Sequence, residues 1–132
     1  MKKNIVLLPD TILYEFKNQN VLSDMNQSLG KNDLCFAIKK ERNKKKLSSL
    51  GALQYNRGRI DKFCDKPNKN FKNFNSYWCS FGFRKSIAEK ILQEMMHSIK
   101  YKETKILSKE FLTSYFFIKN YLDLGTWDNI HK

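Results

Sequence analysis

The side chains best suited to chemistry in this sequence are lysines and arginines, and the chemistry that they suit is contact with phosphate. The chain has 132 residues and a formal net charge of +12. Residues 39–85 hold fourteen basic and three acidic residues, a balance of +11, whereas residues 1–38 balance to 0 and residues 86–132 to +1. Charge concentrated in one stretch favours a polyanionic partner, because solubility alone does not require it. Nucleic acid is the commonest such partner of a small basic protein.

Two segments carry much of this charge, and we predict that both are exposed basic loops. Residues 39–46 read Lys-Lys-Glu-Arg-Asn-Lys-Lys-Lys, and residues 65–76 interleave lysines with phenylalanines. Lysine heads suit a phosphate backbone, and flat rings accept the unstacked bases of single strands. Trp78, just after the second segment, is the main stacking candidate. The predicted contact residues are Lys39, Lys40, Arg42, Lys44, Lys45, Lys46, Arg57, Arg59, Lys66, Lys69, Lys72, Trp78, Arg84 and Lys85.

Several of these residues also have a purely structural interpretation. Phe71 and Phe74 suit the anchoring of a long loop to the core as well as they suit stacking. Arg57 and Arg59 suit phosphate or guanine edges, but neighbouring carboxylates offer ion pairs instead. The pairs expected on that interpretation are Asp61 with Arg57 and Asp65 with Lys62.

Patterns that would indicate catalysis are weak. Asp10, Glu15 and Lys17 have the residue types of a metal-dependent nuclease, but only four residues separate the two acids. His97 and His131 lie far apart, and neither neighbours a serine or cysteine in an activating pattern. The three cysteines, Cys35, Cys64 and Cys79, are too widely spaced for zinc. We therefore predict no catalytic residue, no metal and no cofactor.

The N-terminal apolar run is too short for a signal peptide or a transmembrane helix. It covers Ile5–Leu8 and ends at Pro9, short of the apolar region of a signal peptide, and no stretch reaches the length of a transmembrane helix. The odd number of cysteines suits a reducing compartment. These features predict a cytoplasmic protein without a membrane partner.

The elements that must position the basic residues follow from hydrophobic spacing. Residues 4–8, 34–38 and 77–83 are predicted strands, and residues 11–28 a helix. Ser86 and Glu89 spell a capping box before a helix with Ala88, Leu92, Met95 and Ile99 on one stripe. A last helix is predicted from Ser108 through the aromatic segment 111–122, which also suits a self-association surface. Residues 47–64 fit either a helix or a hairpin turning at Asn56-Arg57-Gly58.

The sequence thus predicts one α+β domain over residues 1–132, with a short three-stranded sheet and two C-terminal helices in the core. Its predicted function is non-catalytic nucleic-acid binding, with RNA or single-stranded DNA favoured. Two alternatives stay open. One is an inhibitor or adaptor of phage or viral type that docks on an acidic protein surface, and the other is a minimal metal-dependent nuclease.

Overall fold

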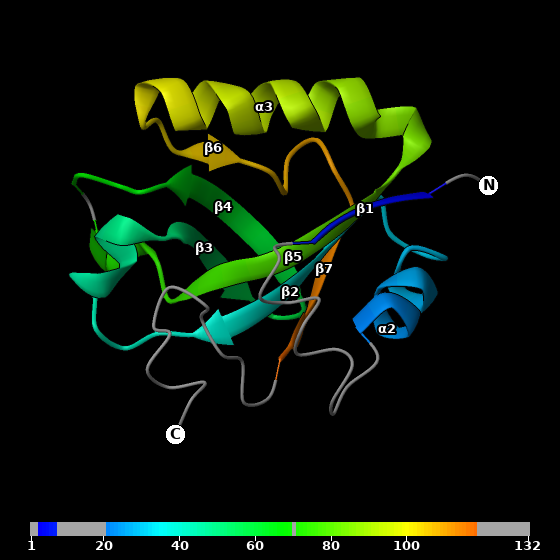
Figure 1. Ribbon diagram of the computed structural model, residues 1–132, viewed down its shortest axis with the longest axis horizontal. Helices are drawn as coiled ribbons and strands as arrows, with labels where there is room; N and C mark the ends of the chain where they lie inside the picture. Colours follow the sequence, from blue (N-terminus) through cyan, green and yellow to red (C-terminus); the bar gives the residue numbers. More distant parts are fainter. Residues whose placement is uncertain (1–2, 8–20, 70, 119–132) are drawn as a thin grey trace, which may run out of the picture.

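A computed structural model describes residues 3–7, 21–69 and 71–118 (Figure 1). Within them, seven strands form one mixed sheet in the order β6-β4-β3-β5-β2-β7, with β1 beside β5. The strands are β1 (Lys3–Leu7), β2 (Leu34–Lys40), β3 (Gly51–Asn56), β4 (Arg59–Asp65), β5 (Ser76–Arg84), β6 (Lys105–Ile106) and β7 (Thr113–Phe117). The helices are α2 (Val21–Ser28) and α3 (Ala88–Tyr101), and the 3-10 turns are η1 (Lys46–Ser49), η2 (Phe71–Asn73) and η3 (Lys85–Ile87).

Strand β5 organises the sheet, because it pairs with three other strands. Strand β2 runs antiparallel along its whole length on one edge. On the other edge, β3 pairs with its first two residues and β1 with its last five. Strand β7 then adds to the outer edge of β2 in the parallel direction. Residues 34–38 of β2 and 79–83 of β5 are buried without interruption, which suits this central position because both faces of the sheet are covered.

The sheet curls until β4 and β7, which are not neighbours in its order, meet. The Thr113 hydroxyl accepts a hydrogen bond from the Ile60 amide at 2.9 Å and donates one to the Ile60 carbonyl at 3.0 Å. Close by, the rings of Tyr55 and Tyr115 lie 5.2 Å apart. The Thr113 side chain therefore satisfies both backbone groups of Ile60, as a paired strand would. This contact between β4 and β7 closes most of the sheet into a barrel-like curve.

The two helices cover opposite faces of the curled sheet. Helix α3 contributes Ile91 and Met95 to the core on the concave face, where they join side chains of β2, β3, β4 and β5. Met25 of helix α2 and Leu29, just after its end, join a smaller core on the other face. A Cβ at Gly82 would lie 2.7 Å from the Met25 sulfur, so glycine lets α2 approach β5 closely.

The predicted three-stranded sheet with two C-terminal helices is wrong. The segment expected as the last helix contains strand β7 over residues 113–117, and residues 119–122 lie outside the described chain. Tyr115 and Phe117 face the concave side with Tyr55, whereas Phe116 and Ile118 face the α2 side. The consecutive aromatic residues of β7 serve both faces of the sheet, and such a run cannot be distinguished from a helix by periodicity.

The strands predicted at 4–8, 34–38 and 77–83 are confirmed as β1, β2 and β5, with ends shifted by up to two residues. Of the helix predicted at 11–28, residues 21–28 are helical and residues 11–20 lie outside the described chain. Residues 51–65 are the β3–β4 hairpin, because Arg57 and Gly58 take the positive φ angles, 49° and 83°, of a tight turn.

The predicted capping box does not form. The turn η3 takes up Lys85–Ile87, so Ile87 becomes the N-cap of α3 and no side chain caps the helix there. The buried stripe of α3 shares Met95 with the predicted stripe, but its other members differ. It consists of Ile91, Met95 and Ser98, while Leu92 and Ile99 are exposed.

Candidate nucleic-acid interface

The fold brings the two basic loops together. The Glu41 amide donates to the Asn75 carbonyl at 3.1 Å, and the Lys44 ammonium donates to the Phe74 carbonyl. The Lys66 amide donates to the Leu50 carbonyl at 2.9 Å. Loops 39–46 and 65–76 are therefore bonded to each other and to the residue that precedes β3, although eighteen residues separate the two loops in sequence.

A small apolar cluster lies beneath the two loops and holds them in place. It consists of Leu47, Ala52, Cys64 and Phe74, with Leu50 and Tyr77 packed against it. Phe74 is only 1% exposed, so it anchors the second loop and is not available to a base. The side chain of Phe71 is not among those described. Burial of Leu47 and Phe74 ties both lysine-rich segments to one apolar cluster.

Lys40 is exposed at the end of β2, beside the Phe117 ring. Six other basic side chains of the paired loops are exposed, and we call these six the basic face. They are Arg42, Lys45, Lys46, Lys66, Lys69 and Lys72. Lys46 lies 3.3 Å from Glu41, and no ion pair is found for the other five among the described residues. Lys44 and Lys39 are half-buried and already have partners. The positive charge of the basic face is therefore largely uncompensated.

Asn75 connects the basic face to a group of rings at the neighbouring end of the sheet. Its side-chain oxygen accepts from the Tyr55 amide, and its side-chain nitrogen donates to the Tyr55 carbonyl, both at 3.1 Å. Tyr55 contacts Tyr115 and Phe117 at ring-centre distances of 5.2 and 5.3 Å. We call these three rings the aromatic cluster. Phe117 is 38% exposed, and the Lys40 ammonium lies 4.8 Å from its ring centre.

The β3–β4 turn places two further predicted residues beside the aromatic cluster. The Gly58 amide donates to the Tyr115 hydroxyl at 3.3 Å, so the turn that carries Arg57 and Arg59 borders these rings. Both arginines are exposed. Asp61 pairs with Arg59 at 2.8 Å and not with Arg57 as predicted. Likewise Asp65 pairs with Lys102 at 3.4 Å, and the expected pair with Lys62 is not formed.

Arg84 and Lys85 lie at the opposite end of β5. Since β5 begins beside the basic loops at Ser76, eight steps of strand separate Arg84 from them by about 27 Å. The Arg84 guanidinium donates to the carbonyls of Leu29 and Gly30, each at 3.0 Å, just after α2. Arg84 therefore holds the C-terminal end of a helix, while Lys85 is exposed on η3.

Trp78 points into the concave core. Its ring meets Phe81 edge to face at 5.1 Å, and a Cβ at Gly51 would lie 2.1 Å from its indole nitrogen. Glycine at position 51 thus provides the space that the indole occupies. Trp78 is partly buried among the residues of this core, so its contacts are those of a packing residue.

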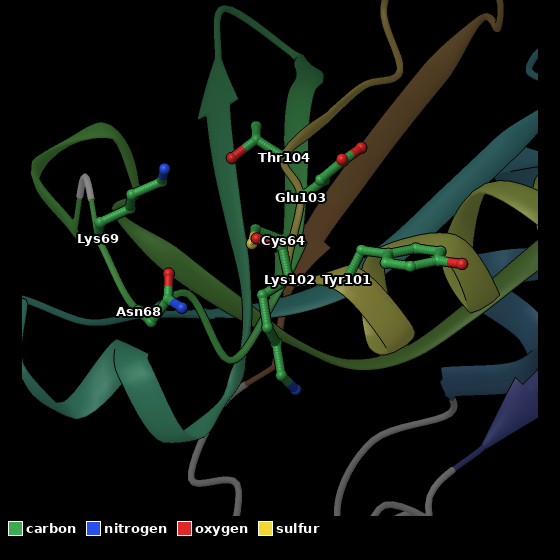
Figure 2. A pocket seen from close by; sticks show the side chains of 7 residues that line it. All are labelled: Cys64, Asn68, Lys69, Tyr101, Lys102, Glu103 and Thr104. Atoms are coloured by element: carbon green, nitrogen blue, oxygen red, sulfur yellow. Dashed lines mark hydrogen bonds between the residues drawn. The ribbon is translucent and has the colours of Figure 1, made fainter.

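A polar pocket of about 730 Å³ adjoins the basic face (Figure 2). In Figure 2, Asn68 and Lys69 from the second loop lie on one side, Glu103 and Thr104 lie on the other, and Cys64 lies between them. Lys102 is paired with Asp65, and Glu103 lies near both His97 and Lys105. Lys69 is the lining cation without a counter-ion among the described residues, which makes this side of the pocket suited to an anion.

The Cys64 thiol at the base of this pocket is not set up as a nucleophile. It is 1% exposed, and its sulfur donates to the Lys102 carbonyl at 3.4 Å. Burial raises the pKa of Cys64, as it does that of Cys35, so both thiols stay protonated near neutral pH. All three cysteines are buried, and none of them forms a disulfide.

Side chains that could bind a metal ion do not gather in the described part of the chain. No group of three or more His, Cys, Asp or Glu side chains could hold a metal ion there. His97 lies 3.4 Å from Glu103, and its ring packs at a tilt of 46° against that of Tyr101. The predicted nuclease-like residues Asp10, Glu15 and Lys17, and the second histidine, His131, lie outside the described residues.

The aromatic cluster was missed from the sequence because its members come from strands β3 and β7, and β7 had the pattern of a helix. The available signal was the strand preference of aromatic residues, which Tyr115, Phe116 and Phe117 share. No known family model matches the chain, and no curated protein is detectably similar to it. None of the helices in the described ranges is long and apolar enough to cross a membrane.

Proposed function

We propose that this protein binds nucleic acid without catalysis, and that its basic face contacts the phosphate backbone. The observation that carries the proposal is the convergence of two distant loops, which gathers six exposed basic side chains over one shared apolar cluster. A solvated loop does not need such anchoring, but a surface that must hold several cations near one another does. Neutralising phosphates with these cations releases counter-ions and supplies the affinity.

The aromatic cluster supports a preference for RNA or single-stranded DNA over duplex. Phe117 presents an exposed ring beside Lys40, and Arg57 and Arg59 lie on the adjacent turn. Single-strand binders combine a cationic track with rings on which bases stack. Phe117 takes the stacking role that the sequence had suggested for Trp78, because the indole packs inward while the Phe117 ring reaches solvent.

The experiment is fluorescence anisotropy with a labelled single-stranded RNA, a single-stranded DNA and the matching duplex, in a series of salt concentrations. The test variant changes Lys45, Lys69 and Lys72 of the basic face to glutamate. The control variant changes Lys31, Lys85 and Lys109 to glutamate; these lysines are also exposed but lie outside the paired loops. Both variants lower the net charge by the same amount.

We expect the test variant to lose binding to all sequences alike and the control variant to retain most of it. Equal losses in both variants would mean that net charge alone drives binding and that the basic face has no special role. Absence of binding in the parent protein would favour an acidic protein surface as the partner. Magnesium-dependent cleavage of the probes would indicate a nuclease and overturn the proposal.

A further inference from the structure

Helix α3 carries a second apolar stripe in addition to the one that it buries. The buried stripe is Ile91, Met95 and Ser98, whereas Leu92, Met96 and Ile99 are 42%, 66% and 50% exposed. These three residues follow the i, i+4, i+7 spacing of one helix face and line a shallow groove of about 690 Å³. Figure 1 shows the outer side of α3 uncovered by any other labelled element. A helix that packs on a sheet needs one apolar stripe, so the second indicates another partner.

The charges on the outer side of α3 indicate which partner. Glu89 lies in the first turn and Lys100 in the last, with Gln93 and Met96 between them on the same ridge. The spacings along this ridge are four, three and four residues, so the spacing is the same when it is counted from either end of the helix. Neither Glu89 nor Lys100 forms an ion pair among the described residues, and the Lys100 ammonium lies 5.2 Å from the centre of the Tyr101 ring.

We propose that this face of α3 binds the same face of a second copy, with the two helices antiparallel about a twofold axis. Antiparallel pairing places Glu89 of each copy opposite Lys100 of the other and Gln93 opposite Met96. Parallel pairing would place like charges together. Helix α3 holds two glutamates and two lysines, so its balance is 0 and it does not add to the repulsion between two molecules of charge +12.

The interface is small. The fourteen residues of α3 span only about 21 Å. A single helix pair of this length buries less area than the roughly 1,600 Å² of a standard interface. We therefore expect a dissociation constant in about the micromolar range.

Sedimentation velocity on the full-length protein over a range of concentrations tests the proposal. We expect the mass to rise from 15.7 kDa toward twice that value. Met96→Glu should abolish the rise, and Glu89→Lys and Lys100→Glu should each weaken it at least tenfold. The double swap of Glu89→Lys with Lys100→Glu should restore it, and so should mixing the two single variants. Circular dichroism and thermal melts confirm that each exposed variant is folded.

Two results would overturn the proposal. One is a monomer at every concentration, which would include the case in which another segment of this chain covers the stripe. The other is a dimer that is insensitive to Met96→Glu and to the single charge reversals, because such a dimer would use a different surface. Binding of nucleic acid is not needed for either readout, so the result does not depend on the proposed function.

Discussion

At the scale of single residues, Asn75 holds the candidate interface together. Its side chain pairs with both backbone groups of Tyr55, and its own backbone bonds to Leu53 and Glu41. One amide thereby links the aromatic cluster to both basic loops. Nothing in the sequence distinguished it from the other asparagines of this loop, because its role depends on strand β3 lying alongside.

We predict that Asn75→Ala destabilises the protein and weakens binding together. Two hydrogen bonds are lost and two backbone groups of Tyr55 are left unpaired, which should cost about 1–3 kcal/mol in the free energy of unfolding. Denaturant titration measures this loss, and anisotropy measures the accompanying fall in affinity for single strands. Asn73→Ala, at an exposed position on η2, is the control. Equal stability of the two variants would contradict the role assigned to Asn75.

Arg84 is predicted to act on stability alone. Its guanidinium donates to two carbonyls after α2 and lies 3.9 Å from Asp33. Since hydrogen bonds that involve a charged group are worth about 1.5–3 kcal/mol, Arg84→Ala should lower the free energy of unfolding by about that amount. Affinity for nucleic acid, measured well below the melting temperature, should stay near that of the parent. A large loss of affinity with unchanged stability would show that Arg84 contacts the ligand after all.

At the scale of elements, strand β7 adds exposed aromatic surface beside the basic residues, which makes this region a candidate site for single-stranded nucleic acid. It pairs with β2 and places Phe117 next to Lys40 and Tyr55. The sequence predicted β1, β2 and β5 because each is short and either alternating or bounded by turn residues. It could not predict β7, since a continuous aromatic run suits a buried helix equally well. The hairpin at residues 51–65 was one of two stated possibilities, and the curl of the sheet selects it.

The prediction for this element concerns Phe117→Ala. If a base stacks on the exposed ring, its loss should weaken single-strand binding by about 1–3 kcal/mol and leave duplex binding nearly unchanged. Leu112→Ala is the matched control, because Leu112 precedes the same strand and is 63% exposed. Competition between single-stranded and duplex probes measures the difference directly. Equal weakening of both probes would assign Phe117 a structural role and remove the main support for strand preference.

At the scale of the whole molecule, the charge asymmetry was visible in the sequence but its geometry was not. Composition located the excess in residues 39–85, and this remains the basis of the proposed function. The fold then divides that excess. Loops 39–46 and 65–76 meet over Leu47 and Phe74, whereas Arg84 and Lys85 are carried to the far end of β5. Long-range strand pairing sets this division, and local sequence patterns do not contain it.

The dependence of affinity on salt tests the central claim most directly. If the six side chains of the basic face each neutralise a phosphate, the logarithm of the association constant for a single strand should fall with the logarithm of salt concentration with a slope of about −4. The variant with Lys45, Lys69 and Lys72 changed to glutamate should give a much flatter slope, and the Lys31, Lys85 and Lys109 control should not. A slope flatter than about −2 for the parent protein would contradict the account, because too few phosphates would then be in contact for the basic face to be the binding surface.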